Sequence, residues 1–334
     1  MGNFPIFPQA GCPNGDVNAC NFTSWERLTP RINGTVHARP GYFDITLESQ
    51  VRAEMTVTNR TALYRFTFPE TPVTPNTTLS PLILLELMDL PHTRTSATIK
   101  IDPATGRLTG GGTFSPSFGI GQYTSYFCAD FKGASIKDSG VFSNSRAAKA
   151  KSLKVITETE AAAERPAGGW VQFNKPTSGN QILVRVGLSF IGEARACENA
   201  ERELDSFDFD DTVAAAEKAW KEKLSVITID AGGASEVVQT AFWSGVYRSM
   251  ISPQDYTGEN PHWNSSEPYY DSYYCIWDSF RSIHPLITLL DPHSQTLMVR
   301  SLLDIYRHEG KLPDCRMSFC KGIIIEEAGG HNNG

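Results

Sequence analysis

Side chains suited to binding a sugar gather in residues 277–284, within a stretch that reads YYDSYYCIWDSFRSIHPLITLLDP from position 269. They are Trp277, Asp278, Phe280, Arg281 and His284. Helical spacing would place Trp277, Phe280, Arg281 and His284 on one face of a predicted helix. A carboxylate can grip a pair of sugar hydroxyls, an indole offers a flat face to the ring, and a guanidinium orients the carboxylate. The pattern therefore predicts a sugar-binding wall.

The same residues allow other interpretations. Trp277 and Phe280 would be core residues, and Asp278 with Arg281 an ordinary surface pair three positions apart. A serine hydrolase would need Ser279 to join Asp278 and a histidine in a triad. We reject the triad, because its members would lie within one short helix and the chain lacks a Gly-x-Ser-x-Gly turn. The core interpretation stays open.

The composition excludes several classes of protein. Of the 334 residues, 40% are hydrophobic and 20% are charged, which is typical of globular chains rather than disordered ones. The net charge is -7, and the one basic cluster, residues 146–154, has no interleaved aromatic residues. We therefore expect no nucleic-acid partner. We also expect no membrane partner, since no run reaches the roughly 18 apolar residues of a membrane helix.

The cysteines have the spacing of short disulfide loops. Cys12 with Cys20, and Cys315 with Cys320, are candidate pairs among the seven cysteines. A zinc site at Cys315, Cys320 and His308 is an alternative, although CxxC and HxxxH spacing is missing there.

Sequons for N-glycosylation also favour the secretory pathway. They lie at Asn21, Asn33, Asn59, Asn76 and Asn264. Residues 1–5 resemble no signal peptide, because they have neither a basic nor an apolar region. We therefore expect a protein that is secreted or passes through the secretory pathway when full-length, and whose front is missing here.

The first part of the chain is predicted to be β-structure. Short β-branched and aromatic runs, separated by Gly and Pro, predict an antiparallel β-sandwich over residues 1–195. The predicted strands cover residues 42–47, 51–57, 62–68, 82–87, 97–101, 123–129, 170–173 and 182–190. Gly110, Gly111 and Gly112 are expected to turn the backbone, because they lack the spacing of a nucleotide-binding loop.

The pattern becomes helical near residue 194. Good helix formers predict helices over residues 194–204 and 211–224, the second capped by Asp210 or Asp211, and residues 196–232 would form a helical linker.

A second predicted domain covers residues 233–334. Ser235 is expected to cap its first helix, and Gly310 to end a helix over about residues 292–307. Pro285 marks a kink or a restart. The predicted class is α+β.

Longer motifs resemble a known family. WDSFRSIHPLITLLDP followed by MVRSLLDIYRHEGKLPD is similar to the signature of the calcium-dependent exo-α-mannosidases of glycoside hydrolase family 92, of the fungal type. Upstream segments resemble that family in the same order: GNFPIFPQAGC, PGYFDITL, AEMTVTNRTALYRFTFP, GGGTFSPSFGIGQYTSYFCADF, VRVGLSFIG and FWSGVYRSMISP. The resemblance is collinear from Gly2 to about Gly322.

The resemblance implies a fold and a reaction. The sandwich would precede an (α/α)6 toroid, of which this chain would hold only the incomplete start. Terminal α-linked mannose would be removed from glycans or glycoproteins with inversion. A carboxylic acid would protonate the leaving oxygen, while a carboxylate roughly 6.5–9.5 Å away activates water. Calcium would bind vicinal sugar hydroxyls through oxygen ligands.

The family's functional residues carry over only in part. Asp278 matches the family's substrate-gripping aspartate, and Trp277, Phe280, Arg281 and His284 complete its motif. These five are therefore the expected substrate-binding residues. The general acid, the general base and the calcium ligands are expected beyond Gly334, the last residue, so no catalytic or metal-binding residue is assigned.

We therefore expect a fragment truncated at both ends. The match breaks down over residues 323–334, where Glu326 and Glu327 are the late carboxylates. As the chain stands, we predict an α-mannosidase by family with little or no activity. The alternative is a non-catalytic carbohydrate-binding fragment. A third interpretation is a chain that does not fold, because an unclosed helical layer would expose apolar surface.

Overall fold

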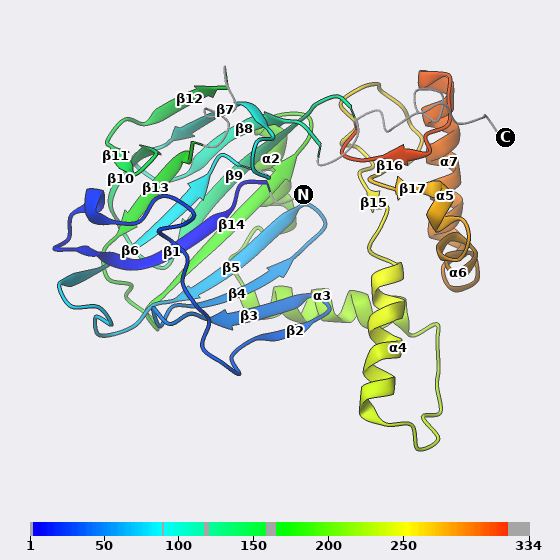
Figure 1. The fold of residues 1–334 in the computed structure, drawn as a ribbon, viewed down its shortest axis with the longest axis horizontal. Coiled ribbons are helices and arrows are strands. Elements are labelled where there is room, and N and C mark those ends of the chain that lie inside the picture. The colour runs from blue at the N-terminus through cyan, green and yellow to red at the C-terminus, as the bar shows by residue number, and fades with distance from the viewer. Residues whose placement is uncertain (1–2, 89, 117–119, 158–164, 320–334) are drawn as a thin grey trace. The chain divides into compact units, whose positions relative to one another are not determined.

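The computed structural model describes residues 3–88, 90–116, 120–157 and 165–319 (Figure 1). The chain divides into two compact units. Unit 1 comprises residues 1–114 and 124–218, and unit 2 comprises residues 115–123 and 219–334. The second boundary falls inside the range predicted as a linker, and the domain limits at residues 195 and 232 stay predictions.

Unit 1 contains two antiparallel sheets. The five-stranded sheet has the order β1 (Ile6–Pro13), β6 (Thr77–Glu86), β13 (Ala167–Phe173), β10 (Ile136–Ser143) and β11 (Arg146–Ala148). The nine-stranded sheet has the order β12 (Ser152–Ile156), β7 (Arg94–Ile101), β8 (Leu108–Phe114), β9 (Tyr123–Lys132), β14 (Gln181–Ser189), β5 (Thr61–Thr67), β4 (Arg52–Val57), β3 (Tyr42–Thr46) and β2 (His37–Arg39). A short 3-10 turn, η1 (Val17–Ala19), follows β1.

The two sheets pack face to face, which confirms the predicted sandwich (Figure 1). Phe131 on one sheet lies 5.4 Å, between ring centroids, from Phe173 on the other. Trp170 is buried, and its indole N–H donates to the carbonyl of Val141 at 3.0 Å, so its polar atom is satisfied inside the core. The core is densest at β13, where all residues from Ala167 to Phe173 are buried, so side chains on both faces of this central strand are covered.

The glycines at 110–112 do not form a turn, contrary to the prediction. They lie inside β8 (Leu108–Phe114). A Cβ atom on Gly110 would lie 2.0 Å from the carbonyl oxygen of Thr98, and one on Gly111 would lie 2.6 Å from the ring of Tyr126. These residues are glycine because neighbouring strands approach closely, which is the other common reason for glycine in a strand.

Helices α2 (Glu193–Glu203) and α3 (Phe209–Leu224) follow the sandwich where helices were predicted. Helix α2 packs tightly on β14, because Gly187 leaves room for it: a Cβ there would lie 2.2 Å from the carbonyl oxygen of Ala196. The cap of α3 is Asp208, whose carboxylate accepts the Asp211 N–H at 3.0 Å. The predicted caps, Asp210 and Asp211, therefore lie too late in the sequence.

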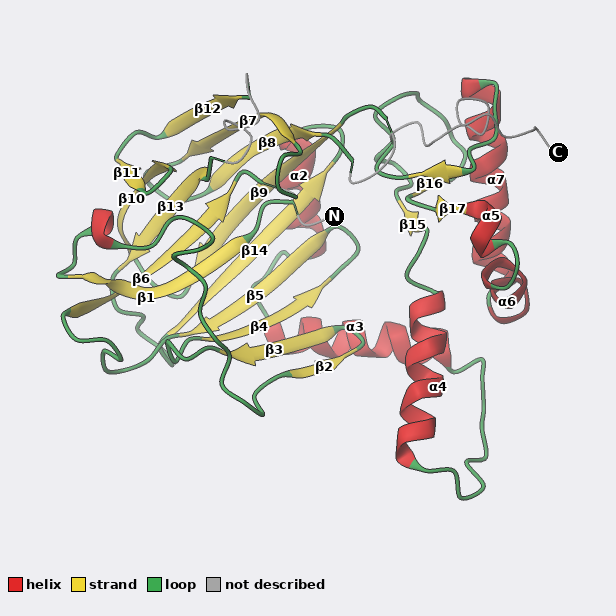
Figure 2. Cartoon of the chain, in the orientation of Figure 1, coloured by secondary structure: helices red, strands yellow, loops and turns green. Residues whose placement is uncertain are grey.

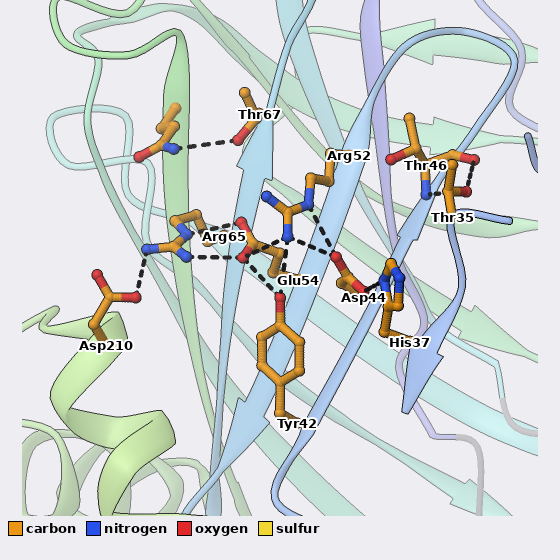
Figure 3. A network of polar contacts seen from close by, with 11 residues as sticks. Thr35, His37, Tyr42, Asp44, Thr46, Arg52, Glu54, Arg65, Thr67 and Asp210 are labelled. Carbon is orange, nitrogen blue, oxygen red and sulfur yellow. Dashed lines mark hydrogen bonds and ion pairs between the residues drawn. The ribbon is translucent and has the colours of Figure 1, made fainter. Parts of the chain in front are cut away.

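A polar network holds the first turn of α3 on the sheet (Figure 3). Arg65 donates two hydrogen bonds of 2.8 Å to the buried Glu54 carboxylate and a third, of 2.9 Å, to Asp210. Burial raises the pKa of Glu54, but hydrogen bonds from Arg65 and Tyr42 outweigh it and lower the pKa overall. Burial and the bond to Glu54 raise the pKa of Tyr42 to about 12. The carboxylates are thus committed to structural partners.

Unit 2 carries the helices that follow (Figure 2). They are α4 (Glu236–Ser249), α5 (Ile276–Ser279), α6 (Ile283–Leu290) and α7 (Pro292–Glu309), with short strands β15 (Gln254–Asp255), β16 (Tyr270–Asp271), β17 (Tyr274–Cys275) and β18 (Cys315–Arg316). Ser235 caps α4 by accepting the Val238 N–H, and Gly310 ends α7 with a left-handed φ of 76°, both as predicted. The α+β class, a sandwich followed by helices, is confirmed.

Disulfides link Cys12 to Cys20, Cys128 to Cys197, and Cys275 to Cys315. The first was a predicted pair. The predicted pairing of Cys315 with Cys320 is wrong, because Cys315 is bonded to a cysteine 40 residues earlier in the chain; Cys320 itself lies outside the described residues. Among the residues that the structure describes, no helix is both long and apolar enough to span a bilayer.

Candidate sugar-binding site

The residues predicted to share one helical face lie on a broken helix. Helix α5 ends at Ser279 and α6 begins at Ile283. Pro285 explains the break, since its ring lacks an N–H and would clash with the carbonyl of Arg281 in a continuous helix. Ser282, between the helices, has φ of -145° and ψ of -42°. The expectation of one continuous face is therefore wrong. We call residues 277–281 the Trp277 turn.

The Trp277 turn is exposed, so the core interpretation is wrong. Trp277 is 53% exposed and Phe280 is 59% exposed. Asp278 and Arg281 are exposed as well. The Arg281 guanidinium donates to the carbonyl of Trp277, at 3.4 Å between Nε and O, which is not the surface pair with Asp278 that the alternative required. Two aromatic rings, a carboxylate and a cation thus face solvent in one turn.

His284 is separated from this exposed group. It lies in α6, partly buried, with Nδ1 3.2 Å from Oε1 of Gln295 on α7. Its ring links the two helices. Of the five predicted substrate-binding residues, the structure brings Trp277, Asp278, Phe280 and Arg281 together and places His284 in a helix contact.

The start of the turn is fixed by the segment around residue 314. The Trp277 N–H donates to Oδ1 of Asp314 at 3.1 Å, and the Ile276 N–H donates to the carbonyl of Asp314 at 2.7 Å. Directly beside them, β17 pairs with β18, and the Cys275–Cys315 disulfide joins the two strands. The backbone that carries the exposed Trp277 indole is therefore held both by hydrogen bonds to Asp314 and by the disulfide-linked strands beside it.

A buried ion cluster adjoins this pair of strands. Arg316, which is 1% exposed, donates from Nε to Asp271 at 2.7 Å, from one terminal nitrogen to both carboxylate oxygens of Glu309 at 2.9 Å, and from the other to the Tyr269 hydroxyl at 2.9 Å. Asp271 is fully buried and also accepts the N–H of Phe319 at 3.2 Å. One cation thus neutralises carboxylates from distant parts of the chain.

The cluster shifts the titration of its members in opposing ways. Burial, and next the charge of Asp271, raise the pKa of Tyr269. Burial lowers the pKa of Arg316, but the charges of Asp271, Tyr269 and Glu309 outweigh it and raise the pKa overall. Arg316 therefore stays charged and Tyr269 neutral over the pH range in which proteins fold.

The tyrosines that precede the turn form its support. Tyr270 and Tyr273 are buried in a core cluster with Ile287 and Met298. Burial, followed by the nearby carboxylates, raises the pKa of Tyr270 to about 12. Tyr274, by contrast, is exposed. The buried tyrosines therefore pack α6 and α7 under the turn instead of contacting a ligand.

Helix α7 begins at a charged cap. Asp291 accepts the N–H of Ser294 at 3.0 Å and its hydroxyl at 2.6 Å, and forms an ion pair with Lys223. Burial raises the pKa of Asp291, but the bonds from Lys223 and Ser294 outweigh it and lower the pKa from 3.8 to about 2.

The described residues do not fit a metal. None of their His, Cys, Asp and Glu side chains form a group of three or more that could hold an ion. The zinc ligand considered above, Cys315, is oxidised in a disulfide, so the zinc alternative is wrong. The Trp277 turn offers aromatic faces and a carboxylate, which are groups that can stack on and hydrogen-bond to a polar ring. No described carboxylate is assigned to acid or base.

The predicted location of the catalytic residues stays a prediction. The general acid, the general base and the calcium ligands were expected beyond Gly334, which itself lies outside the described residues. The late carboxylates Glu326 and Glu327 lie outside them as well. The structure therefore gives a substrate-binding candidate, the Trp277 turn, and leaves the catalytic roles unassigned.

Sequence reasoning gave no role to Asp271, Glu309, Asp314 and Arg316. Asp271 and Arg316 are 45 positions apart, so no local pattern joins them. A charged residue inside an otherwise apolar or aromatic run, such as Asp271 in YYDSYY, was the signal available.

Two family models match the chain. Residues 1–189 match the model described as glycosyl hydrolase family 92 N-terminal domain, and residues 195–330 match the glycosyl hydrolase family 92 catalytic domain. A protein from Arthroderma benhamiae, described as an uncharacterized secreted glycosidase, is 45% identical over 326 residues. That match covers 97% of this chain and 39% of the relative, so the chain spans about two fifths of the relative's length.

Solved structures share the fold. The family GH92 inverting mannosidase BT2199 from Bacteroides thetaiotaomicron superposes with a TM-score of 0.77 at 21% identity, over 95% of this chain and 40% of that one. The family GH92 α-mannosidase BT3965 from the same organism also gives 0.77, at 18% identity, over 96% of this chain and 42% of that one. At these identities the likeness shows the architecture only.

Proposed function

Because the chain belongs to glycosyl hydrolase family 92, we propose that it is part of an α-mannosidase that removes terminal α-linked mannose from glycans. The observation that carries this proposal is the exposed Trp277 turn, in which an indole and a carboxylate are presented together on a fixed backbone. The names of the bacterial structures, an inverting mannosidase and an α-mannosidase, support the substrate and the stereochemistry.

In this proposal the turn binds the terminal sugar. Asp278 accepts hydrogen bonds from two neighbouring sugar hydroxyls. These bonds are stronger than bonds between neutral groups, because the carboxylate is charged. The face of Trp277 covers the C–H side of the ring, and Phe280 widens that apolar surface. Arg281, whose guanidinium donates a hydrogen bond to the Trp277 carbonyl, keeps a positive charge within the turn. His284 acts indirectly, by fixing α6 to α7.

Calcium is proposed for the longer protein and not for the described residues. Their carboxylates either pair with arginine or stand outside any group that could hold an ion. No step is therefore derived through calcium here. Hydrolysis with inversion needs a separate acid and base, and we place both beyond Gly334. The 334-residue chain is thus proposed to bind a terminal mannose but to release it from glycans slowly or not at all.

Export from the cell is part of the proposal. Three disulfides are typical of proteins that mature in an oxidising compartment. The Arthroderma relative is described as secreted. We therefore propose that the protein acts on mannose-containing glycans or glycoproteins outside the cell or in the secretory pathway.

Release of mannose from α-1,2-linked mannobiose tests the catalytic part. The purified chain is assayed with calcium and then with EDTA, and no release in either condition is expected. Calcium-dependent release would show that the chain holds its own acid, base and metal site, and it would overturn the proposal of a binding-only chain. Glu326 and Glu327 would then be the first carboxylates to replace.

A non-catalytic carbohydrate-binding role is the second candidate function. It is supported by the exposed rings and carboxylate of the Trp277 turn, which suit a sugar ring without needing an acid or a base. In a longer, active protein, Asp278→Asn should lower kcat/KM with the fold intact. An unchanged kcat/KM would show that Asp278 is not part of the active site. The Trp277 turn would then at most bind carbohydrate without taking part in hydrolysis.

A further inference from the structure

An exposed tryptophan stands in a loop of unit 1, between η1 and β2. Trp25 is 85% exposed, more than any other large hydrophobic residue that the structure describes. Indole rings are usually covered at least in part, because exposing them to water is unfavourable. An outward indole on a rigid loop is therefore a candidate contact for a ligand.

The loop that carries Trp25 is closed by a capping box. Thr23 donates its hydroxyl to the Glu26 carboxylate at 2.8 Å and its backbone N–H to the same oxygen at 3.1 Å. Glu26 returns a backbone N–H to the Thr23 hydroxyl at 3.3 Å. The Thr23 hydroxyl bond lowers the pKa of Glu26, so the carboxylate stays ionised and the box stays closed near neutral pH. Trp25 lies between these two residues.

Buried side chains on both sides anchor the loop. Phe22 is fully buried, with its ring centroid 5.1 Å from that of Phe142. Arg27 is 7% exposed and pairs with the buried Glu86. The backbone on both sides of Trp25 is thus anchored, so little backbone entropy would be lost when a ligand contacts the indole.

A cavity of about 450 Å³ opens beside the loop. This volume lies in the range of small-molecule sites, roughly 300–1,000 Å³. Its polar lining includes Gln9, Asn21, Arg27 and Glu48, and its apolar lining includes Phe7. The charged Arg27 is more than nine-tenths buried and borders the cavity. Its guanidinium is held in place because it donates to the Thr23 carbonyl and to Glu86.

We propose that Trp25 and this cavity form an accessory carbohydrate-binding site in unit 1, separate from the Trp277 turn of unit 2. Sugars combine an apolar C–H face with many hydroxyls. The cavity lining offers the amides of Gln9 and Asn21, the Arg27 guanidinium and the acceptor Glu48, and the exposed Trp25 indole lies in the loop between Asn21 and Arg27. An anion would be repelled by Glu48, and a purely apolar ligand would take that carboxylate out of water without offering it a hydrogen bond. A neutral oligosaccharide fits this chemistry.

Asn21 is also a sequon residue and borders the same cavity. Its side-chain N–H donates to the carbonyl of Glu26 at 2.7 Å. A glycan attached there would stand where a free sugar is proposed to bind. The protein for the test is therefore made in a host that forms disulfides but adds no N-glycans.

Fluorine NMR on the 5-fluorotryptophan-labelled chain reports each indole separately. The probe is a linear α-linked mannotetraose, and Trp25→Phe identifies the Trp25 resonance. We expect that resonance to shift saturably with the sugar. Glu48→Gln should raise the midpoint of this shift about tenfold, since one charge-assisted hydrogen bond is weakened. Glu70→Gln, an exposed residue outside the cavity lining, should leave it within about twofold.

The same spectra separate this inference from the proposed function. A shift of the Trp277 resonance alone would overturn the accessory site and leave the Trp277 turn supported. A shift of Trp25 alone would support the accessory site and count against the turn. If the sugar shifts the Trp25 resonance with the same midpoint in Glu48→Gln as in the wild type, the proposal that the cavity is part of the site would be overturned.

Discussion

Replacing Arg316 by methionine tests whether the buried ion cluster stabilises unit 2. Arg316 is 1% exposed and makes hydrogen bonds to Asp271, Glu309 and Tyr269. Methionine fills much of the same volume without a charge. The variant leaves Asp271, which is fully buried, without its cation. The cost of breaking a buried pair in this way is about 3–5 kcal/mol.

The assay is urea-induced unfolding, followed through the fluorine resonance of Trp263. The Trp263 ring centroid lies 5.5 Å from that of Tyr269, so this indole reports on unit 2. The matched control is Arg300→Met, which breaks the half-exposed pair of Arg300 with Glu267. Exposed pairs contribute about 0–1 kcal/mol, so the control should unfold close to the wild type.

A double variant separates charge from packing. Adding Asp271→Asn to Arg316→Met removes the uncompensated buried carboxylate, so we expect it to recover at least about half of the lost stability. The reasoning would be refuted if Arg316→Met and Arg300→Met cost the same, or if the double variant were less stable than Arg316→Met alone.

Two further predictions concern single residues. Asp291→Asn keeps a capping side chain but loses the charge paired with Lys223. Because the folded-state pKa of Asp291 is lowered to about 2, the ionised carboxylate stabilises the fold above pH 3.8. The difference in stability between wild type and variant, measured by urea unfolding, should therefore close between about pH 4 and pH 2. A difference that persists undiminished at pH 2 would contradict this. Gly187→Ala places a Cβ 2.2 Å from the carbonyl oxygen of Ala196 and should cost about 1–3 kcal/mol, whereas Gly192→Ala meets nothing within 4 Å and should be near neutral by thermal unfolding. Equal losses in the two alanine variants would show that α2 does not pack closely on β14.

Much of the fold follows from local patterns. The alternation over residues 51–57 and 62–68 predicts strands that the structure has as β4 and β5, and Ser235 and Gly310 delimit helices as their types suggest. Each of these signals depends on neighbours in sequence. A strand that buries one face needs alternating residue types, and the first N–H groups of a helix need an acceptor from a nearby residue. Both requirements are met within a few residues, so a short stretch of sequence shows them.

Long-range packing explains the errors. Three consecutive glycines at 110–112 are compatible either with a turn or with a strand that lies very close to its neighbours. The positions of Thr98 and Tyr126 show that the second alternative applies, and these residues are distant in sequence or on another strand. Cys315 could have paired with a cysteine nearby, but the β17–β18 ladder places it beside Cys275. A pattern read over a few residues does not contain these distances.

The candidate site shows the same division. The resemblance pointed to Trp277 and Asp278, while spacing alone allowed a core position for the indole. Its 53% exposure depends on the break before Pro285 and on Asp314, which holds the turn from a distant segment. Residue types thus indicated the chemistry, and tertiary contacts determined which side chains are available for it.

The most direct test of sugar binding at the Trp277 turn is a titration of α-1,2-linked mannobiose against the fluorine resonance of Trp277, in the wild type and in Asp278→Asn. We predict a saturable shift in the wild type, with a midpoint raised about tenfold in the variant, because a charged acceptor for two hydroxyls is lost. A Trp277 resonance that does not move, or that moves with the same midpoint in both proteins, would contradict the claim that this turn binds the terminal sugar.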